Sequence, residues 1–173
     1  MIIFPSAYFA PIAQYHLIRK HQKFVLDGKE HFVKRSNRNR CNILGAHGPL
    51  QLSIPLQKYS HQDKTEDIRI SFAEDWQSLH WKSIQSAYRN SAYFEFYEDE
   101  FKEFFEHKPT DVLMDFNEML EDKILQLIEV DVEKEKSSSY IKQEPDWRKV
   151  LDKKNDELVE HSYFPHYQQV FTK

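Results

Sequence analysis

Glycine is scarce in this chain, and its placement limits the folds and sites that the chain can build. Three glycines occur in 173 residues, and all of them lie between Gly28 and Gly48. Glycine-rich phosphate loops need several glycines at fixed offsets around a strand-to-helix turn. The sequence therefore excludes a P-loop and a dinucleotide-binding fingerprint. The single cysteine, Cys41, likewise excludes a disulfide framework and a multi-cysteine zinc site.

The hydrophobic pattern of the first 75 residues predicts strands around one early helix. Short apolar runs predict strands at residues 2–4 and 24–26, with a helix over residues 11–20 between them. This order favours a βαβ-like unit with parallel strands. Alternation then predicts a hairpin of residues 40–44 with 50–54 around a Gly-Pro turn, and a further strand over residues 68–72.

From Asp75 onward the hydrophobic period becomes helical. Asp75 caps a predicted helix over residues 76–89, whose inward side includes Trp76, Leu79 and Ile84. A second helix carries an aromatic stripe and ends at Pro109, and a third covers residues 110–128. We expect a flexible, charge-rich connection over residues 129–139 and a short helix opening at residues 145–147. The remaining tail is aromatic, with Tyr163, Phe164, Tyr167 and Phe171.

These segments predict one α/β domain over residues 1–173. It would combine a small mixed β-sheet, with its N-terminal βαβ-like unit and hairpin, and a helical C-terminal half packed on that sheet. Residues 1–75 form a β-rich basic part, and residues 76–128 form a helical part. Residues 129–173 form an acidic connection, a short helix and the aromatic tail.

Charge divides the chain into a basic and an acidic part. Residues 1–93 carry 13 Lys and Arg against 7 Asp and Glu, and residues 94–173 carry 11 against 21. The net charges are therefore +6 and −10, within an overall charge of −4. This asymmetry indicates an anion-facing site in the first part, while simple attraction between the two parts explains it equally well.

The densest cluster of candidate site residues is Lys34, Arg35, Arg38, Asn39 and Arg40. In an extended segment, the last two arginines share one face, and planar guanidinium groups suit carboxylate or phosphate. Asparagine amides add neutral donors and acceptors. We interpret this run as an anion-binding site for a sugar nucleotide or an acyl phosphate. A solvated edge strand guarded by charges is the alternative.

Two further segments carry candidate substrate-binding residues. Ser6 and Tyr8 follow the first strand at its carboxyl end, where open α/β sheets usually bind ligands. Arg89, Asn90 and Tyr93 lie in the turn between two helices, whose mixture of charge, small polar groups and aromatics is typical of a pocket lining. In both segments the alternative is an ordinary turn packed by its aromatic side chains.

The nine histidines do not show metal-ligand spacing, so we predict no metal site. His80 is a candidate general base, because it shares a helix with aromatic residues that we expect to face the basic segment. A hydrogen-bonded core histidine is the alternative. For Cys41, neighbouring arginines predict a lowered pKa and a thiolate, with a small buried apolar residue as the alternative.

Six short segments together carry a family pattern. They are residues 6–11 (SAYFAP), 34–41 (KRSNRNRC), 52–55 (LSIP), 76–80 (WQSLH), 88–94 (YRNSAYF) and 167–171 (YQQVF). In this order, and over nearly the whole chain, they resemble the WbqC-like protein family. The association of that family with gene clusters for O-antigen and other surface polysaccharides implies a transferase. An aminoacyl (glycine) transfer has been suggested for the family.

The chain departs from the family pattern at two places. Many relatives open on a His-Gln-Pro-Asn-Tyr type segment, where this chain has FPSAY at residues 4–8. Any role of that histidine is therefore absent or replaced here. Relatives also continue past the tyrosine-rich element into an aliphatic segment. We therefore expect the C-terminal part of the family pattern to be missing after Lys173.

The leading hypothesis is a cytoplasmic transferase of a glycosyl or aminoacyl group from an anionic activated donor. We expect a small-molecule anionic substrate, such as a nucleotide sugar or an acyl donor, without a fixed cofactor. The apolar runs of the sequence are too short to span a membrane. We expect no nucleic-acid partner for the transferase. The sequence leaves its oligomeric state open. The alternative functions are a non-catalytic module that binds RNA, a nucleotide or another polyanion, and an interaction subunit that docks a partner through acidic helices.

Overall fold

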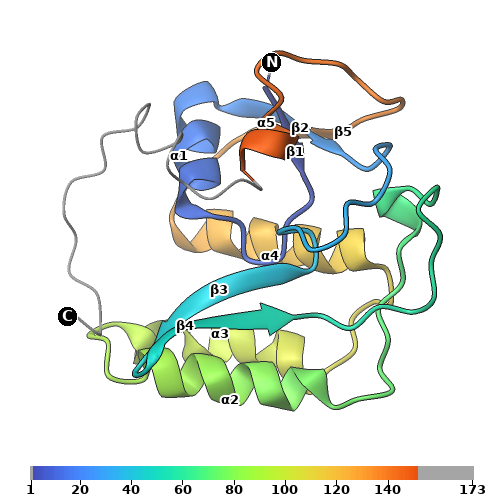
Figure 1. The fold of residues 1–173 in the computed structure, drawn as a ribbon. Coiled ribbons are helices and arrows are strands. Elements are labelled where there is room, and N and C mark those ends of the chain that lie inside the picture. Colours follow the sequence, from blue (N-terminus) through green and yellow to red (C-terminus); the bar gives the residue numbers. More distant parts are fainter. Residues whose placement is uncertain (1, 152–173) are drawn as a thin grey trace.

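The N-terminal apolar runs form a parallel pair of strands joined by a helix. The computed structural model describes residues 2–151 (Figure 1). β1 (Ile2–Pro5) pairs in parallel with β2 (Lys23–Asp27), and α1 (Ile12–His21) connects them. The predicted βαβ-like unit is confirmed. Both strands are almost entirely buried, which explains why they read as continuous apolar runs rather than as alternation.

A third strand extends this sheet where we expected a flexible connection. β5 (Glu133–Lys136) pairs in parallel with β2 and gives the order β1-β2-β5. Its sequence is EKEK, so hydrophobic periodicity could not reveal it. Backbone pairing holds the strand, and Lys23 adds ion pairs at 2.8 Å to Glu133 and 2.9 Å to Glu135. The expectation of a flexible connection is wrong at these residues.

The predicted hairpin is confirmed as a second, separate sheet. β3 (Arg40–Gly45) and β4 (Gly48–Ser53) pair in antiparallel fashion around a turn in which Gly48 has a φ of 117°. Glycine suits this left-handed conformation because it lacks a Cβ atom. The alternation of apolar residues buries Leu52, while Leu50 near the tip is 44% exposed.

The segment after the hairpin does not form the predicted strand at residues 68–72. It contains a short 3₁₀ helix, η1 (Thr65–Asp67), and then single bridges that pair Leu56 with Ile70 and Arg69 with Val112. Alternation did place Ile68 and Ile70 in the core, where they are 1% and 0% exposed. The prediction was wrong because isolated bridges replace a continuous ladder beside these residues.

Three longer helices follow, as predicted. They are α2 (Trp76–Tyr88), α3 (Phe94–Glu106) and α4 (Leu113–Leu127). The side chain of Asp75 accepts from the backbone N–H of Ser78, which confirms the predicted cap of α2. The buried face of α2 includes His80 and Trp81, whereas Leu79 is 64% exposed. The expectation that Leu79 points inward is therefore wrong.

α4 packs on both halves of the molecule. Figure 1 shows it between the parallel sheet with α1 and the layer formed by the hairpin, α2 and α3. Leu113 and Phe116 belong to the hydrophobic cluster on the hairpin side, and Met114 and Leu125 belong to the cluster on the sheet side. Burial of each such side chain stabilises the fold by about 1.5–3 kcal/mol. This one helix thus contributes to both cores.

The described chain ends in the short helix predicted from Pro145. In α5 (Trp147–Val150), the Asp146 side chain accepts from the backbone N–H of Arg148. The aromatic tail with Tyr163, Phe164, Tyr167 and Phe171 lies outside the described residues. Within residues 2–151, no helix is long and apolar enough to cross a membrane.

Candidate functional site

The loop after β1 carries Tyr8, and the fold buries this residue against α2. Tyr8 is 0% exposed, and its backbone N–H donates to the carbonyl of Asn37 at 2.8 Å. The Tyr8 hydroxyl lies 3.0 Å from Nδ1 of His80, which is itself 3% exposed. His80 also forms a hydrogen bond with the Ser53 backbone. Tyr8 and His80 thus join the first loop, the hairpin and α2.

Burial keeps both members of this pair neutral near pH 7. Desolvation lowers the pKa of His80 from 6.5 to about 4, against the opposing effect of the Ser53 hydrogen bond. Desolvation, with a smaller contribution from Cys41, raises the pKa of Tyr8 well above 10.0. The phenol therefore donates to the imidazole. A neutral imidazole can accept a proton, but this one is enclosed by protein.

The arginine–asparagine run folds back on the protein instead of extending. Residues 34–39 form turns, and Arg38 is 1% exposed. Its Nε and Nη2 donate to the two carboxylate oxygens of Glu30 at 2.7 and 2.8 Å. Burial raises the pKa of Glu30, although Arg38 opposes that shift. Asn39 donates from its amide to the carbonyl of Ile54 at 2.9 Å, and so fixes the base of the hairpin.

The carboxyl end of the parallel sheet is occupied by the chain's own polar side chains. Asn117 of α4 donates to the Ser6 hydroxyl at 3.0 Å and to the Arg38 carbonyl at 2.8 Å. Asp27 ends β2, is 0% exposed, and pairs with the buried Arg148 of α5. Ligands of open α/β sheets usually bind at this edge. Here two internal guanidinium groups, those of Arg38 and Arg148, take that position.

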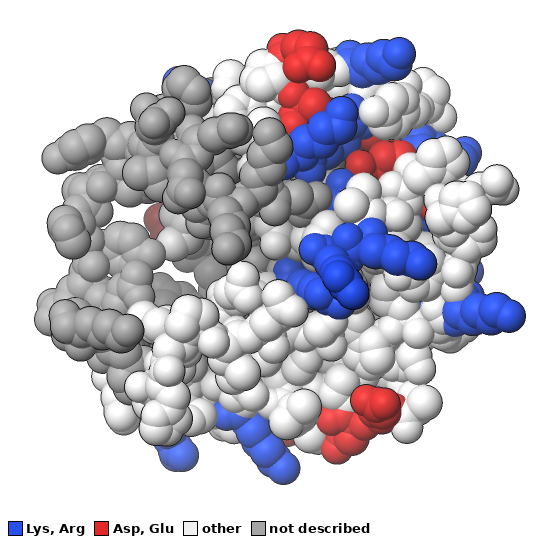
Figure 2. All heavy atoms as spheres, viewed as in Figure 1, with Lys and Arg blue, Asp and Glu red and all other residues white. Residues whose placement is uncertain are grey.

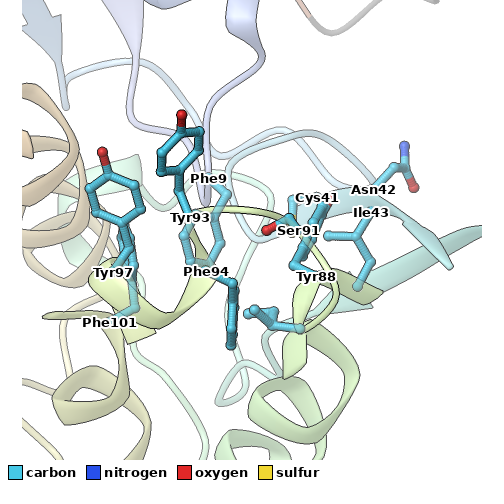
Figure 3. A pocket seen from close by; sticks show the side chains of 11 residues that line it. Phe9, Cys41, Asn42, Ile43, Tyr88, Ser91, Tyr93, Phe94, Tyr97 and Phe101 are labelled. Atoms are coloured by element: carbon cyan, nitrogen blue, oxygen red, sulfur yellow. The ribbon is translucent and has the colours of Figure 1, made fainter. Parts of the chain in front are cut away.

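A cavity of about 430 Å³ lies elsewhere, between the hairpin, the end of α2 and the first half of α3 (Figure 3). Its volume falls in the usual range of small-molecule sites. Three segments that are distant in sequence line it. They are the β1–α1 loop with Phe9, β3 with Cys41, Asn42 and Ile43, and the stretch from the end of α2 into α3 with Ile84, Tyr88, Ser91, Tyr93, Phe94, Tyr97 and Phe101.

Aromatic rings form most of the cavity wall. The Phe9 ring packs on Phe101, with centroids 6.1 Å apart, and Phe94 stacks on Trp81 at 6.3 Å. Phe9 has a φ of 46°, in the left-handed region. This conformation costs about 1–2 kcal/mol for a residue with a side chain, and packing must hold Phe9 in it. Backbone strain of this kind gathers at functional sites, which supports the cavity as the candidate site.

The lining also contains polar atoms, which can orient a ligand through hydrogen bonds. Figure 3 shows the Tyr93 and Tyr97 hydroxyls directed to the same side. These two residues are 69% and 42% exposed, whereas Phe94 between them packs against the hydrophobic core. Ser91 contributes a hydroxyl to the lining, whereas Asn42 is exposed and Figure 3 shows its amide directed away from the other lining side chains. The cavity can therefore bury an apolar group and still form hydrogen bonds.

Two candidate arginines are next to lining residues in the sequence, although neither is itself part of the lining. Arg40 immediately precedes the lining residue Cys41, and Arg89 immediately follows Tyr88. The Nε atom of Arg40 is buried and has no hydrogen-bond partner among the described residues. Such a donor is costly to leave unpaired, so it is available to a ligand. Asn90 precedes the lining residue Ser91 in the same way.

The remaining candidate cations lie on the surface. Lys34 and Arg35 are exposed on the turn before β3. Figure 2 shows Lys and Arg side chains gathered over the start of β3 on this face of the molecule. Within residues 2–151, no group of three or more His, Cys, Asp and Glu side chains is arranged to hold a metal ion.

Cys41 does not have the lowered pKa that its arginine neighbours suggest. Burial raises the pKa of its thiol to about 12, and the residue is 6% exposed. Cys41 lies opposite Leu52 in the hairpin and belongs to the hydrophobic core. The expectation of a lowered pKa is therefore wrong, because desolvation decides the shift, and the alternative of a small buried apolar residue is confirmed.

Sequence reasoning did not select Phe9, Asn42 or Tyr97 as site residues, although signals for them exist. Phe9 follows Tyr8 directly. Tyr97 lies four residues after Tyr93, so both occupy one face of a helix. Asn42 carries no such pattern, since its position depends on how the hairpin packs against α2.

Comparison of the chain with curated proteins and with solved structures gave no match. Comparison with family models gave one match, to the WbqC-like protein family, over residues 6–170. The matched span starts in the β1–α1 loop and includes every segment that lines the cavity. Since the match covers nearly the whole sequence, the chain belongs to the WbqC-like protein family.

Proposed function

We propose that this protein is a group transferase that holds an anionic activated donor in the cavity between the hairpin, α2 and α3. The transferred group is glycosyl or aminoacyl (glycine), and the reaction serves the cytoplasmic biosynthesis of O-antigen or another surface polysaccharide. The observation that carries the proposal is Arg40, a cation with a buried donor that has no partner among the described residues and that precedes the lining residue Cys41 in the sequence. Membership of the WbqC-like family supports the choice of reaction.

In such a transfer, an acceptor hydroxyl or amine attacks the carbon atom that carries the leaving group. A bond forms from the acceptor to that carbon while the bond to the leaving oxygen or sulfur breaks. The leaving group takes the bonding electron pair, and the acceptor proton passes to a base. Fixed cations stabilise the charge that develops on the leaving group, and an apolar wall keeps out water that would hydrolyse the donor.

The proposal divides the candidate residues by their positions. Arg40 and Arg89 hold the anionic part of the donor, while Asn90 and Tyr93 orient the acceptor. Lys34 and Arg35 attract anions from solution, since both are exposed on the turn before β3.

The buried candidates act through other residues. Tyr8 and His80 hold the loop that carries Phe9, and His80 is a positioning residue in this proposal, because 3% of it is exposed. Ser6, Arg38 and Asn39 fix the turns that lead into β3 through their hydrogen bonds.

A panel of nucleotide sugars, coenzyme A esters and nucleotides tests the proposal. We expect at least one anionic donor to raise the unfolding midpoint, and mass spectrometry to detect its group on an acceptor saccharide or amine. Arg40→Gln should remove the shift. Arg19→Gln, a matched change at an exposed position on α1, should retain it. A panel without any shift or product contradicts the proposal, as does a shift that Arg40→Gln leaves unchanged.

The cations over the start of β3 favour one alternative function, a non-catalytic module that binds polyanions such as RNA (Figure 2). Such binding weakens steeply with salt, because it releases counterions. The alternative predicts that Lys34→Gln and Arg35→Gln weaken RNA binding whereas Ser91→Trp does not. Absence of RNA binding at low salt rules it out.

A further inference from the structure

We infer that the cavity binds a planar heteroaromatic ring, so that the donor is activated as a nucleotide whose base lies among the aromatic side chains. The phosphates of that nucleotide then reach Arg40 and Arg89. This inference rests on the proposed function and narrows its donor to one chemical class.

The composition of the lining favours a ring over an alkyl chain. Six of the eleven lining residues are Phe or Tyr, two are isoleucines, and none is charged. Nucleobases stack on aromatic side chains because both present a flat π-face. An alkyl chain gains nothing from flat walls beyond the burial of area.

The aromatic wall is held rigid by a second row of rings. Phe94 lines the cavity and stacks on Trp81 with an interplanar angle of 27°, and Trp81 stacks on Phe105 at 21° with centroids 5.5 Å apart. Phe105 is 5% exposed and belongs to the core. A wall fixed in this way loses little freedom when a flat ligand packs on it.

The polar groups of the lining suit the edge of a base. The Ser91 hydroxyl can donate or accept a hydrogen bond, and so can the tyrosine hydroxyls of the lining. A lipid tail would leave these groups without a function.

The charge around the cavity suits the phosphates. Arg40 precedes the lining residue Cys41 in β3, and Arg89 follows the lining residue Tyr88 at the end of α2. The buried Nε of Arg40 has no partner among the described residues. Guanidinium groups bind phosphate oxygens through paired, charge-assisted hydrogen bonds. The cavity thus combines an aromatic wall with hydroxyl groups, and two arginines are next to lining residues in the sequence, which suits a nucleotide.

Calorimetric titration of the full-length chain tests this inference. The probes are UDP and ADP, with inorganic pyrophosphate and ribose 5-phosphate as ligands that lack the base, and decyl phosphate as an anion with an alkyl chain. We expect at least one nucleoside diphosphate to bind tenfold or more tightly than pyrophosphate and ribose 5-phosphate. Equal affinity for pyrophosphate overturns the inference, and so does tighter binding of decyl phosphate than of either nucleotide.

A matched pair of variants locates the binding. Ser91→Trp introduces an indole at a lining position, whereas Ala92→Trp introduces it at the next residue, which is exposed and does not line the cavity. Circular dichroism checks that both variants fold. We expect Ser91→Trp to weaken nucleotide binding at least tenfold and Ala92→Trp to leave it unchanged. A folded Ser91→Trp protein with wild-type affinity overturns the inference.

The outcomes separate this inference from the proposed function. Base-dependent binding without transfer from any donor would contradict the function and leave the inference standing. Transfer from a donor that is not a nucleotide, with no affinity for UDP or ADP, would overturn the inference and leave the function standing.

Discussion

The Tyr8 hydroxyl and the Nδ1 atom of His80 lie 3.0 Å apart, and this contact couples the first loop of the chain to α2. Both residues are enclosed, and the next residue, Phe9, lines the cavity. Because burial keeps the imidazole neutral, its Nδ1 atom can accept a hydrogen bond from the phenol. The protonation state of His80 therefore affects the wall of the candidate site as well as the stability of the fold.

His80 should make the protein less stable in acid. Its pKa is about 4 in the folded protein and near 6.5 when exposed. The unfolded chain therefore binds more protons between these values, and the free energy of unfolding falls as the pH drops from 6.5 to 4, by up to about 3 kcal/mol. Denaturant titrations across this range should show that His80→Gln loses this slope. An unchanged slope in the variant would show that His80 is not its source.

Glu121 should give a pH dependence of opposite sign. This α4 carboxyl is 5% exposed, and burial raises its pKa from 4.5 to about 7, although Lys134 and the Gln14 hydrogen bond at 2.9 Å oppose the shift. Its Oε2 atom has no hydrogen-bond partner among the described residues. The neighbouring carboxyls of Asp122 and Glu118 raise this pKa further.

The stability that protonated Glu121 contributes is present below pH 4.5 and is lost as the pH rises through 7. Glu121→Gln keeps the shape and removes the charge. We expect it to raise the free energy of unfolding at pH 8 by about 1–3 kcal/mol, and to make no comparable change at pH 4.5. Equal effects at both pH values would disprove the buried charge as the cause.

The Arg38–Glu30 pair should be essential for folding, in contrast to exposed pairs. Arg38→Ala leaves the carboxylate of Glu30 buried without its partner, which costs about 3–5 kcal/mol. Arg69→Ala breaks the pair with Asp111, whose side chains are 50% and 56% exposed, and should cost less than about 1 kcal/mol. Unfolding midpoints in urea compare the two variants. Similar losses in both would contradict the assignment of Arg38 to the fold.

Cys41 should resist thiol reagents until the protein unfolds. A pKa of about 12 leaves almost no thiolate at pH 8, and burial restricts access. With Ellman's reagent, we expect labelling at least about 100-fold slower in buffer than in guanidinium chloride. Fast labelling of the folded protein would instead indicate an accessible thiolate at the cavity wall.

The sequence predicts those helices and strands whose positions depend on a local pattern of side chains. The apolar runs of β1 and β2 and the Asp75 cap each leave a local signal, and each prediction is confirmed. β5 leaves none, because its EKEK sequence is polar throughout and its place depends on backbone pairing with β2. The prediction that Leu79 points inward is wrong because two faces of α2 carry apolar residues, and tertiary packing determines which face is buried.

The site was harder to predict because its geometry is made by tertiary contacts. Arg38 and Arg40 look alike in sequence, yet Glu30 neutralises one of them, while the Nε atom of the other has no partner among the described residues. The composition of the α2–α3 turn predicts a pocket lining, and Tyr93 does line the cavity. Phe9 joins the same wall through a backbone conformation that its residue type does not favour.

Hydrogen–deuterium exchange of the protein with and without its best-binding donor tests the cavity as the donor site most directly. We expect the bound donor to slow exchange in peptides that cover β3 and the turn between α2 and α3, since these segments line the cavity. Peptides that cover β5 and α5, at the polar edge of the parallel sheet, should stay unchanged. Protection confined to β5 and α5, with none at β3 or the turn, would contradict the account.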